Sequence, residues 1–263
     1  MLNLIFTIGP HTRLRRKYSH IRMVRRDGIL EITFHSDGRT LVWGGGPHGQ
    51  FGPAFHDIAQ DRENKLVIMT GTGDAFIEEI SAEVLGERLP KNKITPTTWD
   101  HIYSDAKRLL MNLLDIEVPV IAAVNGPVNI HAEIAVLSDI VLAADHAAFA
   151  DAPHFPNGLV PGDGVHVIWP YLLGRNRGRY FLLTGQRLSA QEALQLGVVN
   201  EVMPANKLLP RARELARQIL NQPPLTVRYA RVVMTQELKK LLLEHLSHGL
   251  ALQGLAANEY WPS

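Results

Sequence analysis

A segment rich in proline and glycine, between Ala150 and Gly164, carries a histidine and an aspartate nine residues apart, His154 and Asp163. Its three prolines and three glycines predict a structured loop, and loops held by a rigid scaffold carry much of enzyme chemistry. A carboxylate that accepts a hydrogen bond from one imidazole nitrogen fixes the tautomer and leaves the other nitrogen to act as a base toward water. The pair therefore indicates either a catalytic base with its orienting acid or a structural loop histidine, and the spacing alone does not decide between them.

His131 is a further residue whose type could do chemistry. It follows the apolar run 120–124 and has apolar neighbours, which is typical of a histidine held inside a core. The same position suits a donor aimed at a carbonyl oxygen, as in an oxyanion hole. A third interpretation makes His131, His154 and Asp163 a two-histidine, one-carboxylate metal site. No His-x-His or His-x-x-x-His spacing links these residues, so the metal site ranks last.

Apolar runs and amphipathic stretches predict the scaffold that must position these side chains. An Asp27-Gly28 turn signal joins two runs of a hairpin, and the amphipathic stretch Trp99–Leu114 predicts a helix that ends before Val118-Pro119. The expected strands are 21–25, 29–34, 66–70, 120–124 and 140–144. Strands that alternate with helices predict an α/β fold.

The character of the chain changes after about Asn200. Leu208–Leu220 is amphipathic, Pro223-Pro224 breaks that helix, and Thr226–Asn258 predicts one or two further helices with no strand between them. We therefore expect a core over residues 1–205, which includes a basic N-terminal arm, and a helical region over residues 206–263. The stretch Leu238–Leu255 is apolar enough to pack outside its own helix pair, so a subunit interface is plausible there.

Two other features have simpler interpretations. The seven Lys and Arg residues between His11 and Arg26 are typical of a solvated arm, with an anion-binding patch as the alternative. Gly44–Gly46 lacks the lysine and following Ser or Thr of a phosphate loop, and Gly71–Gly73 lacks a third glycine. We interpret both glycine-rich stretches as turns.

Composition excludes several classes of site and partner. The 263 residues are 46% hydrophobic and 20% charged, which is typical of a globular protein. The absence of cysteine removes disulfides, thiolate nucleophiles and iron–sulfur clusters. A net charge of +1 does not favour a nucleic-acid or membrane partner. The apolar opening MLNLIFTIGP lacks the features of a signal peptide, and no run is long enough for a membrane span, so a cytoplasmic location is expected.

Several motifs, in order along roughly half of the chain, resemble the crotonase (enoyl-CoA hydratase/isomerase) superfamily. They are Val118–Gly126, Ser138–Ala144, Val160–Gly162, Leu183–Ala193 and Leu196–Asn200. The resemblance implies a spiral core of repeated ββα units, a helical C-terminal region that supports trimerisation, and trimers or pairs of trimers.

The chain departs from the CoA-ester members of that superfamily at three places. The segment that supplies one oxyanion amide is replaced by Phe76–Ser81, and the glycine run that supplies the second is replaced by Asn129–Ala132. The acid–base glutamate of the later loop is His154. These departures argue against a CoA thioester substrate.

The sequence is similar, over nearly its full length, to the 6-oxocamphor hydrolase branch, whose members are β-diketone hydrolases. The motifs of this branch are Leu41–Trp43, His56–Ile58, Pro153–Pro156, Pro161–Gly164 and Gly178–Gly185. The resemblance implies that His154 and Asp163 form a catalytic dyad and that His131 contacts the substrate carbonyl. It also implies substrate contacts at these positions: Trp43, His48, Leu85 and Gln253, the last in place of a glutamate.

The implied reaction is hydrolysis of the carbon–carbon bond between the two carbonyls of a cyclic or bicyclic 1,3-diketone, with no cofactor and no metal. We expect the rate to fall on the acid side of neutrality as His154 is protonated. Two alternatives are an acyl-CoA hydratase or isomerase that uses His154 in place of glutamate, and a non-catalytic RNA binder that uses the basic arm.

Overall fold

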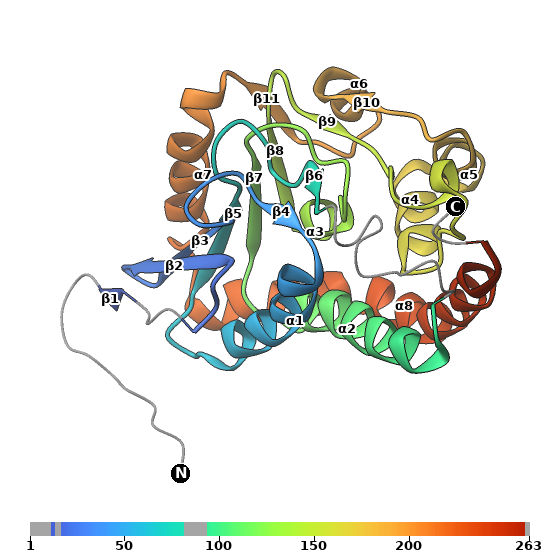
Figure 1. Ribbon diagram of the computed structural model, residues 1–263. Helices are drawn as coiled ribbons and strands as arrows, with labels where there is room; N and C mark the ends of the chain where they lie inside the picture. Colours follow the sequence, from blue (N-terminus) through green and yellow to red (C-terminus); the bar gives the residue numbers. More distant parts are fainter. Residues whose placement is uncertain (1–11, 14–16, 82–93, 261–263) are drawn as a thin grey trace, which may run out of the picture.

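The computed structural model describes residues 12–13, 17–81 and 94–260, which form a seven-stranded sheet covered by helices (Figure 1). The strands are β1 (Thr12–Arg13), β2 (Ile21–Arg26), β3 (Ile29–Phe34), β4 (Val42–Trp43), β5 (Leu66–Thr70), β6 (Glu79–Ile80), β7 (Val120–Val124), β8 (Ile140–Ala144), β9 (Ala148–Phe149), β10 (Leu188–Ser189) and β11 (Glu201–Met203). The helices are α1 (Gly45–Gln60), α2 (Pro96–Leu114), α3 (Glu133–Val136), the 3-10 helix η2 (Phe155–Asn157), α4 (Val165–Leu173), α5 (Arg175–Thr184), α6 (Ala190–Gln195), α7 (Ala205–Ile219) and α8 (Pro224–Tyr260).

The main sheet has the order β1-β2-β3-β5-β7-β8-β11. β1, β2 and β3 pair antiparallel, whereas every pair from β3 to β11 is parallel. The parallel strands β5 and β7 are buried along their whole length, as expected for a sheet with helices on both faces. Two small sheets, β4-β6 and β9-β10, lie outside the main sheet.

Alternate residues of the parallel strands face two separate apolar clusters. Leu66 and Ile68 of β5 pack with Leu208 and Ala212 of α7, while the intervening residues join the cluster that contains α1 and α2. Figure 1 shows α7 on one side of the sheet and α1 and α2 on the other. The helix α7 is therefore part of the core that supports the sheet.

The structure confirms the predicted hairpin, the three predicted buried strands and the helix ending at Leu114. That helix starts earlier than predicted, at Pro96, because the Thr95 hydroxyl caps it by accepting a hydrogen bond from the Thr98 amide at 3.1 Å. The prediction of a turn at Gly44–Gly46 is wrong, since Gly45 and Gly46 form the first turn of α1. Gly73 does lie in a turn, with φ of +70°.

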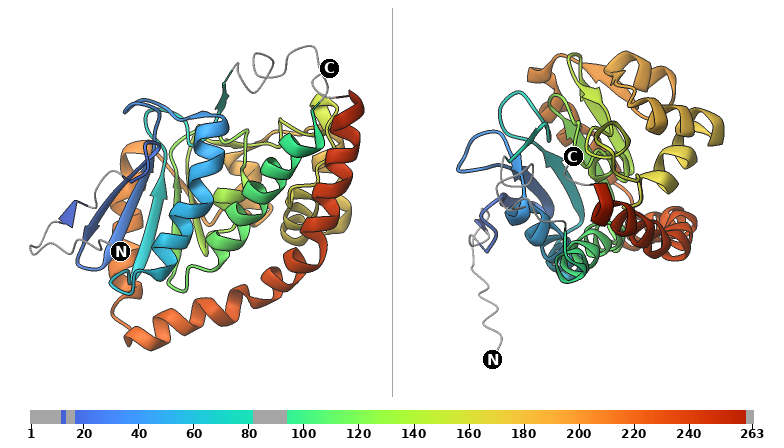
Figure 2. Two further views of the ribbon diagram at one scale, coloured as in Figure 1. Left: turned by 60° about the horizontal axis from the view of Figure 1, so that its bottom comes forward. Right: turned by 45° about the vertical axis from the view of Figure 1, so that its right-hand side comes forward.

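The predicted C-terminal helices are one continuous helix, α8, which runs alongside α2 (Figure 2). The Trp99 indole donates to the Leu250 carbonyl at 3.0 Å, and the fully buried Arg231 pairs with Asp139 at 2.7 Å. A buried arginine that is paired and hydrogen-bonded ties the helix to the sheet. α8 therefore brings residues near the end of the chain against the loop that carries Asp163.

Among the helices of the described residues, none combines the length and apolar character that a bilayer span requires.

Candidate active site

The loop that carries His154 and Asp163 connects β9 to α4 and is held against α8 by close backbone packing. A Cβ atom at Gly162 would lie 2.2 Å from the Gly249 carbonyl oxygen, and one at Gly249 would lie 2.3 Å from the Gly162 carbonyl oxygen. Only glycine at both positions permits this approach. Gly164, with φ of +108°, then turns the chain into α4. Asp163 is thus fixed between two backbone constraints.

His154 lies between two carboxylates. Its Nε2 is 3.2 Å from Oδ2 of Asp163, and its Nδ1 is 2.5 Å from Oδ1 of Asp151. All three residues are buried, at 4–6% exposure. The structure thus brings the predicted pair together. It also shows Asp151 bound to the second ring nitrogen of His154, which we expected to have no carboxylate partner.

The two carboxylates decide the charge of His154. Burial alone would lower the pKa of the imidazole, but the negative charges of Asp163 and Asp151 outweigh it and hold the pKa well above its ordinary value of 6.5. Burial would raise the pKa of Asp163, yet the neighbouring His154 lowers it below its usual range. Both shifts favour the imidazolium form of His154 beside the carboxylate of Asp163.

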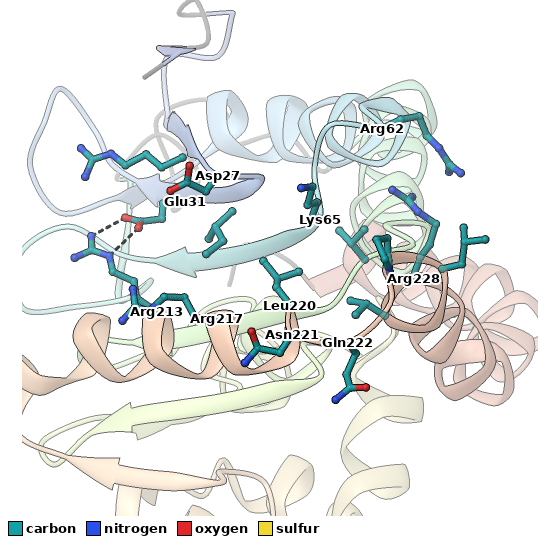
Figure 3. A pocket seen from close by; sticks show the side chains of 16 residues that line it. Asp27, Glu31, Arg62, Lys65, Arg213, Arg217, Leu220, Asn221, Gln222 and Arg228 are labelled. Carbon is teal, nitrogen blue, oxygen red and sulfur yellow. Dashed lines mark hydrogen bonds and ion pairs between the residues drawn. The ribbon is translucent and has the colours of Figure 1, made fainter. Parts of the chain in front are cut away.

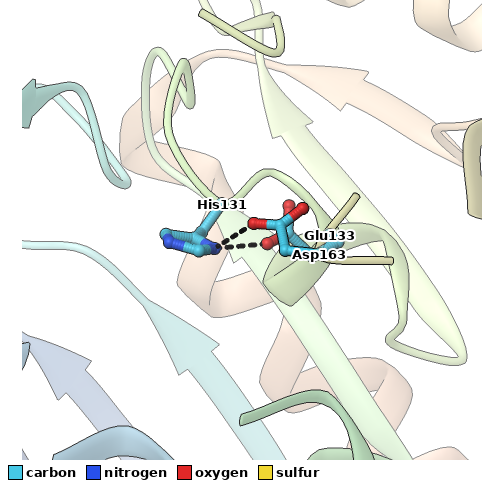
Figure 4. A group of neighbouring side chains, drawn as sticks. All are labelled: His131, Glu133 and Asp163. Atoms are coloured by element: carbon cyan, nitrogen blue, oxygen red, sulfur yellow. Dashed lines mark hydrogen bonds and ion pairs between the residues drawn. The ribbon is translucent and has the colours of Figure 1, made fainter. Parts of the chain in front are cut away.

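His131 lies on the other side of Asp163, between β7 and α3. Its Nδ1 is 4.0 Å from Oδ2 of Asp163 and is hydrogen-bonded directly to Oε1 of Glu133 (Figure 4). The backbone of His131 has φ of +48°, a conformation that few non-glycine residues adopt and that often marks a functional site. One carboxylate, that of Asp163, thus lies next to both histidines.

Two of the predicted substrate contacts gather around His131. The ring centroid of Trp43, on β4, is 4.3 Å from that of His131, and the ring of His48, on α1, is 5.9 Å from it. Nδ1 of His48 is 3.8 Å from Oδ2 of Asp105. Aromatic and imidazole rings therefore form one wall of the site.

Gln253 is brought to the same region by α8. The residue is 6% exposed, and its Oε1 has no hydrogen-bond partner within the described residues. It packs closely on Gly162: a Cβ atom added at Gly162 would lie 2.9 Å from the Cβ of Gln253. Leu85 lies outside the described residues.

Three side chains, His131, Glu133 and Asp163, present ligand atoms within 4.8 Å of one another, a grouping that could hold a cation. Nδ1 of His131 and Oε1 of Glu133 are already joined by a direct hydrogen bond, which a cation would have to replace. We therefore describe His131 and Glu133 as a hydrogen-bonded pair.

Sequence reasoning missed two acidic residues of this array, Asp151 and Glu133. Asp151 stands three residues before His154 in a loop, where no periodicity relates the two positions. Glu133 stands in the apolar stretch around His131, and a lone glutamate in such a stretch was the available signal.

A cavity of about 700 Å³ lies elsewhere, at the amino-terminal ends of β5 and β7 (Figure 3). Six of its sixteen lining residues are basic, but Arg213 pairs with Glu31 at 2.7 Å, and Arg62 pairs with Glu117 outside the lining. Ligands of parallel α/β sheets bind beyond the carboxyl ends of the strands, where His131 follows β7. The histidine array is therefore the better candidate for an active site.

Comparisons with known proteins agree on the fold. The sequence profile of the Enoyl-CoA hydratase/isomerase family matches residues 47–257. The carnitinyl-CoA dehydratase of Salmonella arizonae is 35% identical over 217 residues, which cover 79% of this chain and 77% of that protein.

Solved structures extend this likeness. The structure of ABDH, a β-diketone hydrolase from the cyanobacterium Anabaena sp. PCC 7120 bound to (S)-3-oxocyclohexyl acetic acid, is 48% identical with a TM-score of 0.88, and the match covers 92% of this chain and 96% of that one. An enoyl-CoA hydratase/isomerase from Mycobacterium paratuberculosis is 26% identical with a TM-score of 0.82, over 91% and 94% of the two chains. The predicted crotonase fold is confirmed, and the chain belongs to the enoyl-CoA hydratase/isomerase family of the crotonase superfamily.

Proposed function

We propose that the protein is a β-diketone hydrolase that cleaves the carbon–carbon bond between two carbonyls. The observation that carries the proposal is the buried array Asp151–His154–Asp163–His131, which offers a base, its orienting acids and a carbonyl-binding donor in one place. The 48% identity to a β-diketone hydrolase supports this reaction over the chemistry of CoA esters.

The array suggests how water is activated. Asp151 orients His154 through Nδ1, so Nε2 faces Asp163 and the site. Oδ1 of Asp163 is buried and has no hydrogen-bond partner within the described residues, so it can accept a hydrogen bond from a water molecule next to Nε2. His154 in its neutral form takes the proton of that water as the oxygen attacks one substrate carbonyl.

The remaining groups handle the negative charge that the attack creates. His131, beside Trp43, donates a hydrogen bond to the oxyanion of the tetrahedral intermediate. When the intermediate collapses, the carbon–carbon bond breaks and its electron pair forms the enolate of the second carbonyl, near Gln253. Return of the proton from His154 to the enolate carbon gives a keto acid. The β-carbonyl is the electron sink, so these steps balance without a cofactor.

The ligand of the Anabaena protein suggests a test substrate. (S)-3-oxocyclohexyl acetic acid is a keto acid, and joining its carboxyl carbon to the ring carbon across from the side chain, next to the ketone, gives bicyclo[2.2.2]octane-2,6-dione. We expect this protein to open that diketone to the keto acid and to leave crotonyl-CoA unchanged, as measured by mass spectrometry of both reactions. Hydration of crotonyl-CoA without turnover of any diketone would instead favour the CoA-ester alternative.

The charge of His154 predicts an unusual pH dependence. The base must be neutral, and its pKa is raised well above 6.5, so kcat/KM should still rise with pH above neutrality and should be low in acid. The sequence alone predicts that the rate falls on the acid side of neutrality. The structure moves this fall to higher pH, because Asp151 adds a second negative charge next to His154. A kcat/KM profile that is flat between about pH 5 and 8 would contradict a histidine base.

We also propose a homotrimer or a pair of trimers, located in the cytoplasm. The exposed apolar side chains of α8 support an assembly: Leu225, Tyr229, Val233, Met234, Leu243 and Leu255 are each at least half exposed. Sedimentation equilibrium should give three or six times the mass of the chain, and a monomer at micromolar concentration would contradict this.

A further inference from the structure

Glu133 is a buried carboxylate that the proposed reaction does not use. Its side chain is 2% exposed, and it lies at the start of α3 among buried apolar residues. A carboxylate is costly to bury unless it is paired and hydrogen-bonded. The partner of Glu133 is Nδ1 of His131, so its placement is directed at the histidine that faces the substrate.

The surroundings of His131 hold its ring in one orientation. The ring packs against Trp43, the backbone at φ +48° sets its direction, and Nδ1 is occupied by Glu133. The two nitrogens of an imidazole lie on different edges of the ring. Nε2 is therefore the nitrogen that remains to meet a carbonyl oxygen.

We propose that Glu133 is a positioning residue, which holds the Nδ1 proton of His131 so that Nε2–H of the same ring donates to the substrate oxyanion. This inference rests on the proposed function. In this role Glu133 fixes both the orientation and the positive charge of the His131 ring. The charge matters because a charged donor binds an oxyanion more strongly than a neutral one.

The charges that face His131 support this role. Burial raises the pKa of Glu133, whereas the charge and hydrogen bond of His131 lower it, so His131 and Glu133 stabilise each other as an ion pair. Asp163 favours protonation of His131, His154 opposes it, and the ring of His48 lies 5.9 Å away. Burial would lower the pKa of His131, but the charge and hydrogen bond of Glu133, with a smaller effect of Asp163, raise it. Without the charge of Glu133, burial and His154 would favour the neutral ring, in which either nitrogen can carry the proton.

The direct test is the titration of His131 in Glu133→Gln, followed by NMR of protein labelled with ¹⁵N in its histidine side chains. We expect the pKa of His131 to fall, because glutamine keeps the shape and removes the charge. In Glu133→Asp, which keeps the charge, His131 should titrate closer to wild type; this variant also decides the point if Glu133→Gln fails to fold. Glu214→Gln, at an exposed site on α7, is the matched control and should leave His131 unchanged.

Kinetics should report the same coupling. Glu133→Gln should lower kcat by up to roughly 10²–10³-fold, the cost of one oxyanion donor, with little change in KM. The basic limb of its kcat profile should move to lower pH, since His131 loses its proton earlier. In a His131→Ala background, Glu133→Gln should have almost no further effect on kcat, because the group it positions is absent.

Two results would overturn the inference: an unchanged titration of His131 in Glu133→Gln, or kcat losses that multiply in the double variant. If the wild-type enzyme hydrolyses no β-diketone, the proposed function fails by itself. The NMR titration then still decides whether Glu133 sets the charge of His131.

Discussion

An Asp163→Asn enzyme should fold, yet it should lose roughly three to four orders of magnitude in kcat, comparable to the loss when a carboxylate next to a catalytic histidine is replaced by an amide. Asparagine keeps the volume of the side chain but removes the charge that lies 3.2 Å from Nε2 of His154 and 4.0 Å from Nδ1 of His131. It also changes the carboxylate whose Oδ1 atom is proposed to accept a hydrogen bond from the attacking water. One substitution thus affects the base, the oxyanion donor and the nucleophile.

A second readout separates this mechanism from simple damage to the fold. The charge of Asp163 raises the pKa of His154, so its removal should lower that pKa and move the acid limb of the residual kcat/KM profile to lower pH. Asp145→Asn, at an exposed aspartate, is the matched control and should keep both the rate and the profile of wild type. An Asp163→Asn enzyme with most of its activity would show that the dyad is assigned wrongly.

His154→Gln should lower kcat by roughly 10²–10⁴-fold, the range for loss of a general base. Glutamine still offers a donor to Asp151 or Asp163 but accepts no proton near neutral pH. The residual activity should lose the rise with pH above neutrality that the wild-type enzyme shows, because the group that titrates is gone.

The control for this variant is His146→Gln, since the side chain of His146 is 46% exposed and pairs only with its neighbour Asp145 among the contacts of the described residues. It should match wild type in rate and pH profile. Thermal unfolding of both variants checks the fold, because His154→Gln leaves two buried carboxylates without a cation. If His154→Gln keeps the wild-type pH profile, the general base lies elsewhere.

Local patterns predicted five of the seven strands of the main sheet and missed the short strands β1 and β11. The strands β5, β7 and β8 are continuous apolar runs, and burial on both faces of a parallel sheet requires such runs. The number of C-terminal helices could not be predicted, because Gly249 and Gly254 lie inside α8, where a glycine often marks a helix end, and its exposed apolar residues blur the helical pattern. Its contact through the buried Arg231 depends on Asp139, far away in the sequence.

The sequence predicted three residues of the site and missed two. A resemblance pointed to His154, Asp163 and His131, and their proximity follows from the fold. Asp151 and Glu133 each act on a histidine two or three residues away, through loop and left-handed backbone geometry that residue types alone do not encode. The consequence is substantial, because these two carboxylates, together with Asp163, favour the charged forms of both histidines.

The central claim is that water adds to a carbonyl and a carbon–carbon bond then breaks, and labelling with ¹⁸O tests it most directly. The protein is incubated with bicyclo[2.2.2]octane-2,6-dione in H₂¹⁸O, and the product is analysed by mass spectrometry, with a no-enzyme reaction to correct for exchange of ketone oxygens. The account predicts a ring-opened keto acid whose carboxylate carries one heavy oxygen from water. No turnover of this or related cyclic diketones, or a product without the label in its carboxylate, would contradict it.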